Sequence, residues 1–126
     1  MISQDDIDAF AESSQGQPVK GLNEYQSKAV SFAIYPDTYK VLYPALGLCG
    51  EAGEVAEKVK KQIRDNKHEG IFDRHGIAKE LGDVLWYLSN TANDIGFSLQ
   101  DIANMNVDKL ADRKDRGVIK GSGDNR

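Results

Sequence analysis

The fold is decided by the stretch between Tyr43 and Gly96, which contains the segment LCGEAGEVAEK at residues 48–58 and the segment KELGDVLWYL at residues 79–88. Each segment carries two carboxylates three residues apart, and these are Glu51 and Glu54, then Glu80 and Asp83. Residues three apart lie on the same side of a helix. Two such helices packed antiparallel would bring the four carboxylates to one place.

Carboxylates gathered at one place repel one another unless a cation lies between them. Hard oxygen ligands of this kind favour Mg²⁺ or Mn²⁺. A single pair with this spacing also occurs on solvated helix faces, and Glu54–Lys58 and Glu57–Lys61 have the i,i+4 spacing of exposed ion pairs. The second acidic pair, at a matching offset from the apolar stripe of its own helix, favours a metal site over a solvated surface.

A carboxylate-bridged di-iron site is the other metal chemistry to weigh. It requires Glu-x-x-His motifs on facing helices. Neither His68 nor His75 lies three residues after a glutamate in these helices, so we interpret both as loop or helix-start residues. Cys49 has no neighbouring cysteine or histidine in the sequence and is interpreted as a small packing residue.

The composition is that of an ordinary globular protein. The chain has 126 residues, 40% hydrophobic and 29% charged, which predicts one domain. A net charge of −4 argues against a surface for nucleic-acid polymers. One cysteine, an acidic N-terminus and no apolar run of about 20 residues predict a cytoplasmic protein without a signal peptide or membrane span.

Apolar periodicity predicts an all-α protein, a bundle of four to five helices. The expected helices span residues 22–35, 43–64, 73–96 and 98–117, with a further turn or two around Asp5–Glu12. Asn23 is the expected cap of the first helix, Pro36 stops it, and Ser98 with Asp101 forms a capping box. The chain is thereby divided into a polar segment 1–21, a helical domain 22–117 and a flexible tail 118–126.

Apolar side chains predict which helix faces are buried. The expected stripes are Leu48, Ala52, Val55, Ala56, Val59 and Ile63 in one helix, and Leu99, Ile102, Ala103, Val107 and Leu110 in the last. Gly50 and Gly53 each cost about 1 kcal/mol inside a helix, which predicts close approach by another backbone or by a ligand. Trp86 projects away from the stripe of its own helix, which predicts oligomerisation.

The last helix carries Asn106, Lys109 and Arg113 along one edge. Cations near a helix C-terminus also interact favourably with its dipole, which is the plainer interpretation. Combined with a metal, however, the two cations would form a phosphate clamp, because phosphoryl transfer needs its negative charge neutralised. A tyrosine cluster at residues 35, 39 and 43 either packs against the bundle or lines a base pocket.

These motifs together resemble the MazG-like branch of the all-α nucleoside triphosphate pyrophosphohydrolases. The resemblance rests on Glu51-x-x-Glu54, 25 intervening residues, Glu80-x-x-Asp83, and then Asn106-x-x-Lys109-Leu110-x-x-Arg113. It covers about residues 22–126. Phosphoribosyl-ATP pyrophosphohydrolases and dimeric dUTP hydrolases belong to the same superfamily.

The resemblance implies a Mg²⁺-dependent enzyme, with Mn²⁺ as a substitute, that hydrolyses a (deoxy)nucleoside triphosphate to the monophosphate and pyrophosphate. Glu51, Glu54, Glu80 and Asp83 would hold metal, and Glu51 or Glu54 would accept the proton of the attacking water. The implied substrate-binding residues are Lys58, Tyr87, Asn106, Lys109 and Arg113. A homodimer or homotetramer is expected, since family members build the site between paired subunits.

One alternative lies outside enzyme chemistry. In it the chain is a non-catalytic helical module that binds nucleotides or joins subunits, and its acidic faces are merely solvated. Within the enzyme class, phosphoribosyl-ATP, dUTP or dCTP are the alternative substrates.

Overall fold

The computed structural model describes Asp5, residues 18–65 and residues 73–125, and all its regular elements are helical. In chain order they are α2 (Leu22–Ser31), the 3₁₀ helix η1 (Asp37–Tyr39), α3 (Leu42–Arg64), α4 (Arg74–Asp94) and α5 (Leu99–Asp115). No strand occurs among the described residues, which confirms the all-α prediction. The helical turns expected around residues 5–12 lie outside the described residues except for Asp5. None of the described helices has the length and apolarity that crossing a membrane requires.

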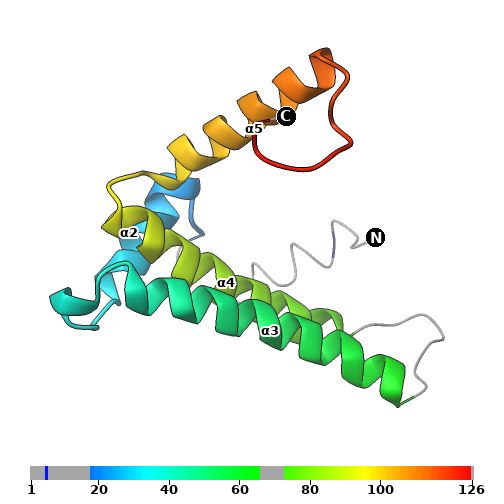
Figure 1. The fold of residues 1–126 in the computed structure, drawn as a ribbon. Helices are drawn as coiled ribbons and strands as arrows, with labels where there is room; N and C mark the ends of the chain where they lie inside the picture. The colour runs from blue at the N-terminus through cyan, green and yellow to red at the C-terminus, as the bar shows by residue number, and fades with distance from the viewer. Residues whose placement is uncertain (1–4, 6–17, 66–72, 126) are drawn as a thin grey trace.

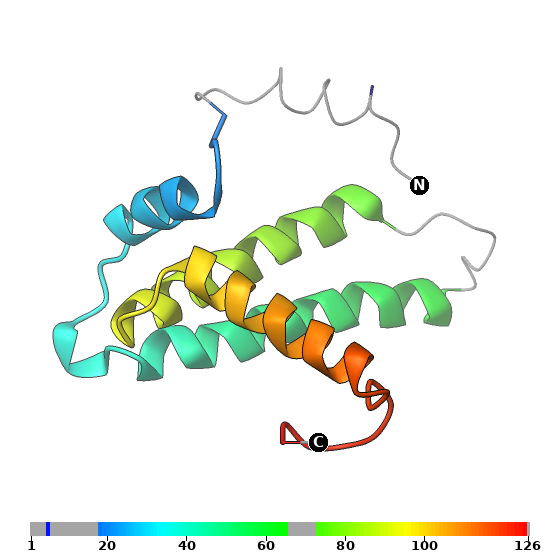
Figure 2. The same ribbon diagram turned by 90° about the horizontal axis from the view of Figure 1, so that it is seen from above.

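The centre of the fold is the antiparallel pair of α3 and α4 (Figure 1). Gly47 and Lys58 show the register, because Gly47 lies against Tyr87 near the end of α4 while Lys58 pairs with Glu80 near its start. The side of α3 that faces α4 therefore includes Gly47 and Lys58. α2 packs across α4 on another side, as seen from above in Figure 2.

The buried face of α3 is rotated from the one predicted. Leu48, Val55 and Val59 of the expected stripe are half-buried, but Ala52, Ala56 and Ile63 are exposed, Ile63 by 58%. The reason is the glycine at position 47, which allows α4 to approach that side of the helix. This rotation turns Glu51 toward α4.

The first helix ends earlier than predicted, at Ser31 rather than near Tyr35. Its last carbonyl groups are taken by side chains: the Ser31 hydroxyl donates to Lys28 O at 2.6 Å and Trp86 Nε1 donates to Ala29 O at 3.1 Å. The cap is Gly21 without a side-chain bond, so the prediction of Asn23 as the cap is wrong. Asn23 Oδ1 instead accepts from the backbone N–H of Gln100 in α5, at 3.3 Å.

The turn from α4 to α5 forms as predicted. Gly96 has φ +85°, and Phe97 N donates to Ala92 O at 2.9 Å, which closes the end of α4. Ser98 and Asp101 form the capping box, with Asp101 N donating to Ser98 Oγ at 3.0 Å.

Buried Gln26 joins three helices at this turn. Its amide donates to Ser89 O at 3.3 Å and to Phe97 O at 3.0 Å, and it accepts from Leu99 N at 3.0 Å.

Beyond this junction α5 leaves the α3–α4 pair at an angle (Figure 1). The predicted packing of Val107 and Leu110 is accordingly absent within the described chain, where they are 63% and 44% exposed. The described hydrophobic residues that are fully buried are few: Ala29, Ala92 and Leu99. Trp86, expected at a subunit interface, instead contacts α2 of its own chain through its hydrogen bond to Ala29.

Asp94 holds the segment between α2 and α3. Its Oδ2 accepts from Tyr35 Oη at 2.8 Å and from Val41 N at 2.8 Å. Burial and this hydrogen bond raise the pKa of Tyr35 to about 12. Val41 has φ +68° and ψ −52°, and Leu42 N donates to Lys40 O at 2.8 Å, so Val41 is the central residue of a γ-turn with positive φ, which is strained for a β-branched residue. Asp94 therefore compensates for backbone strain at the start of α3.

Asp94→Ala is expected to lower the free energy of unfolding by about 1–3 kcal/mol, because two hydrogen bonds are lost and the strain at Val41 remains. Asp37→Ala is the matched control, since that carboxylate is 92% exposed and pairs with Lys40, the residue after η1, and its effect should stay within about 0.5 kcal/mol. Urea unfolding followed by circular dichroism measures both. Equal effects of the two substitutions would contradict the anchoring role of Asp94.

Candidate metal and phosphate site

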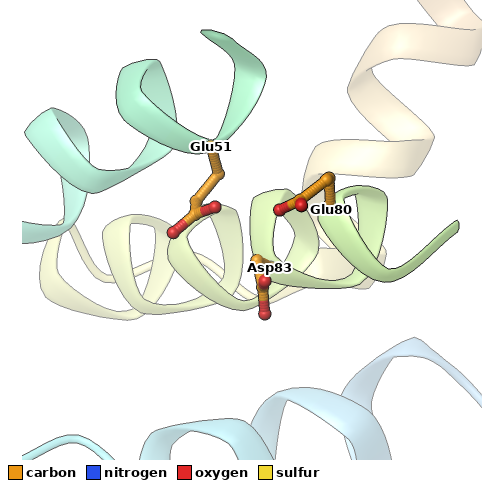
Figure 3. A group of neighbouring side chains, drawn as sticks. All are labelled: Glu51, Glu80 and Asp83. Carbon is orange, nitrogen blue, oxygen red and sulfur yellow. The ribbon is translucent and has the colours of Figure 1, made fainter. Parts of the chain in front are cut away.

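Three carboxylates from two helices converge between α3 and α4 (Figure 3). Glu51 of α3 and Glu80 and Asp83 of α4 each offer an oxygen, and these oxygens lie within 4.8 Å of one another. We call these three residues the acidic triad. Glu80 points toward Glu51, whereas Asp83 points toward the side on which α2 lies. Glu51 and Glu80 are half-buried and Asp83 is exposed.

The fourth predicted carboxylate, Glu54, is exposed and lies outside the triad. Three residues along a helix turn a side chain by about 60° from its starting direction, which carries Glu54 away from α4 once Glu51 faces it. Its charge nevertheless contributes to raising the pKa of Glu51.

Lys58 supplies a positive charge next to the triad. Its Nζ lies 3.5 Å from Glu80 Oε1 and 3.9 Å from Asp73 Oδ2, the carboxylate that caps the start of α4. Its expected partner within the helix, Glu54, is not the one it contacts. One ammonium group leaves the triad with excess negative charge.

The excess negative charge affects the pKa of Glu51. It is raised, first by burial and then by the charges of Asp83, Glu80 and Glu54. A divalent cation would relieve the repulsion, and three carboxylate oxygens at this separation suit a hard ion such as Mg²⁺ or Mn²⁺. The triad therefore fits the metal that the sequence predicts. Among the described residues, no histidine belongs to this group, whereas a di-iron site would require histidine ligands.

Tyrosines border the triad on one side. The Tyr87 ring lies 6.4 Å from that of Tyr43, and Tyr43 stacks on Tyr35 at 5.0 Å. The pKa of Tyr87 is raised by burial first, then by Tyr43, Glu51 and Asp83, which places it beside the acidic charges. This tyrosine row is a surface on which a planar base can stack.

Tyr25 of α2 is a neighbour of the site that the sequence did not identify as such. Its pKa is raised by burial and by the charge of Asp83. In the sequence it reads as an apolar residue of its helix, 58 positions before Asp83, and only the packing of α2 on α4 reveals its place.

Asn106, Lys109 and Arg113 lie on α5, which diverges from the triad within one chain (Figure 1). Asn106 and Lys109 line an open pocket of about 380 Å³ together with Ile95, Phe97, Ile102 and Met105. Arg113 is 5% exposed. The described chain thus brings Glu51, Glu80, Asp83, Lys58 and Tyr87 together, and places the α5 residues elsewhere.

In the absence of metal, Glu51→Gln is expected to raise the melting temperature at pH 8, because glutamine resembles the protonated carboxyl. The pKa of Glu51 is higher in the folded state than its ordinary value of 4.5, so the folded state favours the protonated carboxyl group. This stabilising contribution is fully present below pH 4.5 and is lost as the pH rises through the folded-state pKa. The two proteins should therefore converge near pH 4.5. Thermal unfolding in EDTA at several pH values measures this difference.

A wild-type protein that is more stable than the variant at pH 8 in EDTA would contradict the repulsion between the triad carboxylates. Saturating Mg²⁺ serves as the internal control, since it should stabilise the wild-type protein more than the variant.

Comparisons with known proteins identify the family of the chain. A family model described as the MazG nucleotide pyrophosphohydrolase domain matches residues 41–118. The Gene 37 protein of Mycobacterium phage L5 is 47% identical over 111 residues, which cover 81% of this chain and 96% of that protein. No solved structure matches the chain. The matched family range includes α3, α4 and α5, and with them the whole acidic triad.

Proposed function

The chain belongs to the MazG nucleotide pyrophosphohydrolase family, and from this we propose that it hydrolyses a nucleoside triphosphate between the α and β phosphates, yielding the monophosphate and pyrophosphate. The observation that carries the proposal is the convergence of Glu51, Glu80 and Asp83 from two helices. A solvated acidic surface does not require carboxylates to face one another across a helix pair. The proposed biological role is the removal or adjustment of nucleotides in the cellular pool.

The proposed roles of the residues are based on their positions. The acidic triad binds Mg²⁺, which would neutralise phosphate charge and lower the pKa of a bound water. Lys58 lies at the edge of the triad, within reach of both Glu80 and Asp73, where it can transfer its contact to a phosphate oxygen. Glu54 is exposed beside Glu51 and is either the proton acceptor for the attacking water or a fourth metal ligand. The tyrosine row receives the base.

A second copy of the chain completes the proposed site. Lys109 and Arg113, the proposed phosphate ligands, leave the triad of their own subunit with α5, and apolar residues of α3 and α5 are exposed. Pairing of two subunits would cover these faces and bring α5 of one subunit to the triad of the other. A homodimer or homotetramer is the proposed active form.

Mixing two inactive variants tests this pairing. Glu51→Gln and Lys109→Ala alter residues on different helices, so mixed oligomers contain some sites with both residues intact. Recovery of pyrophosphate release on mixing supports a site shared between subunits. If mixed oligomers form and stay inactive, the triad and α5 act within one subunit.

The central experiment measures pyrophosphate release from canonical and modified NTPs and dNTPs, with Mg²⁺, Mn²⁺ or EDTA. Metal-dependent formation of monophosphate and pyrophosphate supports the proposal, and the rank order of substrates gives the specificity. Folded protein that binds nucleotides without turning any of them over would overturn it in favour of the non-catalytic module.

A further inference from the structure

The C-terminal segment 118–125 folds back along α5 (Figures 1 and 2), although the sequence predicts a flexible tail. We call it the C-terminal strap. It begins with a hydrogen bond from Val118 N to Arg113 O at 2.8 Å. Gly121 with φ +128° and Gly123 with φ +85° take backbone conformations that glycine adopts readily, and these reverse the chain.

The strap ends on the two cations of α5. Arg113 Nη2 donates to Asp124 O at 2.8 Å and to Gly123 O at 3.3 Å. The carboxylate of Asp124 lies 3.5 Å from the same nitrogen and 3.6 Å from Lys109 Nζ. An anionic oxygen is therefore already held between Lys109 and Arg113, which is the position that a phosphate oxygen would take.

The fit of the strap to Arg113 is incomplete. The Arg113 side chain is 6% exposed, yet its Nε has no hydrogen-bond partner among the described residues. A buried donor without an acceptor is costly, and a guanidinium group is best satisfied by two parallel bonds to one anion. This unpartnered buried N–H indicates that the arginine site suits a ligand with more oxygens than the strap provides.

The balance of charge points the same way. One carboxylate faces two cations, so the pair keeps a positive charge while the strap is bound. Asp124 itself is 88% exposed, so water weakens its attraction to both cations. A phosphate chain with several negative charges would bind the same cations more strongly and could replace the carboxylate.

We propose that the C-terminal strap is an internal competitor for the phosphate site of Lys109 and Arg113. The Asp124 carboxylate pairs with Lys109 and Arg113 when no nucleotide is bound. The phosphate chain of the substrate, or the pyrophosphate product, displaces this carboxylate. This inference rests on the proposed function for the identity of the anion. Phosphate ligands bind only to molecules in which the strap is released. The apparent Kd therefore equals the intrinsic Kd divided by the fraction of molecules with a released strap.

Binding of inorganic pyrophosphate in EDTA tests the competition without any turnover. ¹⁵N NMR of the full chain follows the amides of Gly121 and Gly123, which should shift together as pyrophosphate releases the strap. Asp124→Asn is expected to lower the Kd for pyrophosphate about threefold to tenfold. Asp108→Asn removes the same charge from an exposed position of α5 and should leave the Kd unchanged.

Three results would overturn the proposal: pyrophosphate that does not bind, binding that leaves the glycine amides unmoved, or equal affinity in the wild-type protein and Asp124→Asn. Steady-state kinetics add a second measurement. Asp124→Asn should lower KM for the nucleotide by the same factor with kcat unchanged, whereas a raised KM would make Asp124 a ligand of the active site instead.

Different results would overturn the hydrolase function and the competition by the C-terminal strap. Strap release by pyrophosphate in a protein that hydrolyses no nucleotide would overturn the hydrolase function and keep the anion site. Nucleotide hydrolysis without strap release would overturn the competition alone.

Discussion

Glu51→Gln is expected to lower kcat/KM for nucleotide hydrolysis by at least about a thousandfold, since the substitution removes one of the three carboxylates that we propose as ligands of the catalytic metal. Glu51 is the triad member contributed by α3, so its loss separates the metal from that helix. The amide keeps the shape of the carboxyl group but carries no charge. Pyrophosphate release at saturating Mg²⁺ measures the effect.

The control for this prediction is Glu57→Gln. Glu57 lies on the same helix and pairs with Lys60 and Lys61 at the surface, so its substitution removes the same charge without touching the triad. Activity within about twofold of the wild-type protein is expected, because surface substitutions of this kind are nearly neutral. A Glu51→Gln variant that keeps a tenth or more of the activity would contradict the triad as the metal site.

Unfolding cannot explain the expected loss. Removing the charge of Glu51 relieves repulsion from Asp83 and Glu80, so the variant should be at least as stable as the wild-type protein in EDTA. An inactive and well-folded variant would therefore locate the defect in metal binding. Calorimetric titration with Mg²⁺ should show weaker binding in the same variant and unchanged binding in Glu57→Gln.

The helices could be predicted from the sequence because their signals are local. Asp73, Ser98 and Gly96 act within a few residues of themselves, and the structure places a cap or a helix end at each one. The spacing of Glu80 and Asp83 likewise needs only the geometry of one helix. These features were all predicted correctly.

Features that depend on how helices approach one another were not predicted correctly. Periodicity shows that a helix has two sides but does not show which side α4 will cover, so the buried face of α3 was rotated from the prediction and Glu54 lies apart from the triad. Tyr25 joins the site only through the packing of α2. The course of α5 depends on the junction at Gln26, whose three bonds link residues 63 to 73 positions apart in the chain.

The glycines of α3 also show that local sequence does not reveal which positions contact another helix. Gly50 and Gly53 were predicted to allow close approach, but a Cβ at either position meets nothing within 4 Å in the described chain. The glycine that allows close approach is Gly47, where a Cβ would overlap the ring of Tyr87. Local sequence does not distinguish these positions, because all three glycines are equally unfavourable within a helix.

Replacing glycine with alanine should therefore have opposite effects on stability at Gly50 and at Gly47. Gly50→Ala should raise the free energy of unfolding by about 0.5–1 kcal/mol, because alanine favours the helix and nothing occupies the added volume. Gly47→Ala should lower it by about 1–3 kcal/mol in spite of the same gain in helix propensity, because the rigid Tyr87 ring must move. Urea unfolding of the two variants under identical conditions measures both values.

The effect at Gly47 extends to the site. Tyr87 packs edge-on against Trp86 at 4.9 Å, and Trp86 is tied to α2, so the ring has little room to retreat and must push α3 away from α4. That movement would carry Glu51 away from Glu80 and Asp83. Gly47→Ala should therefore weaken Mg²⁺ binding as well as stability, whereas Tyr87→Ala in the same background should restore the metal affinity by removing the overlap. If the double variant binds Mg²⁺ no better than Gly47→Ala alone, contact with Tyr87 is not what sets the spacing of the triad.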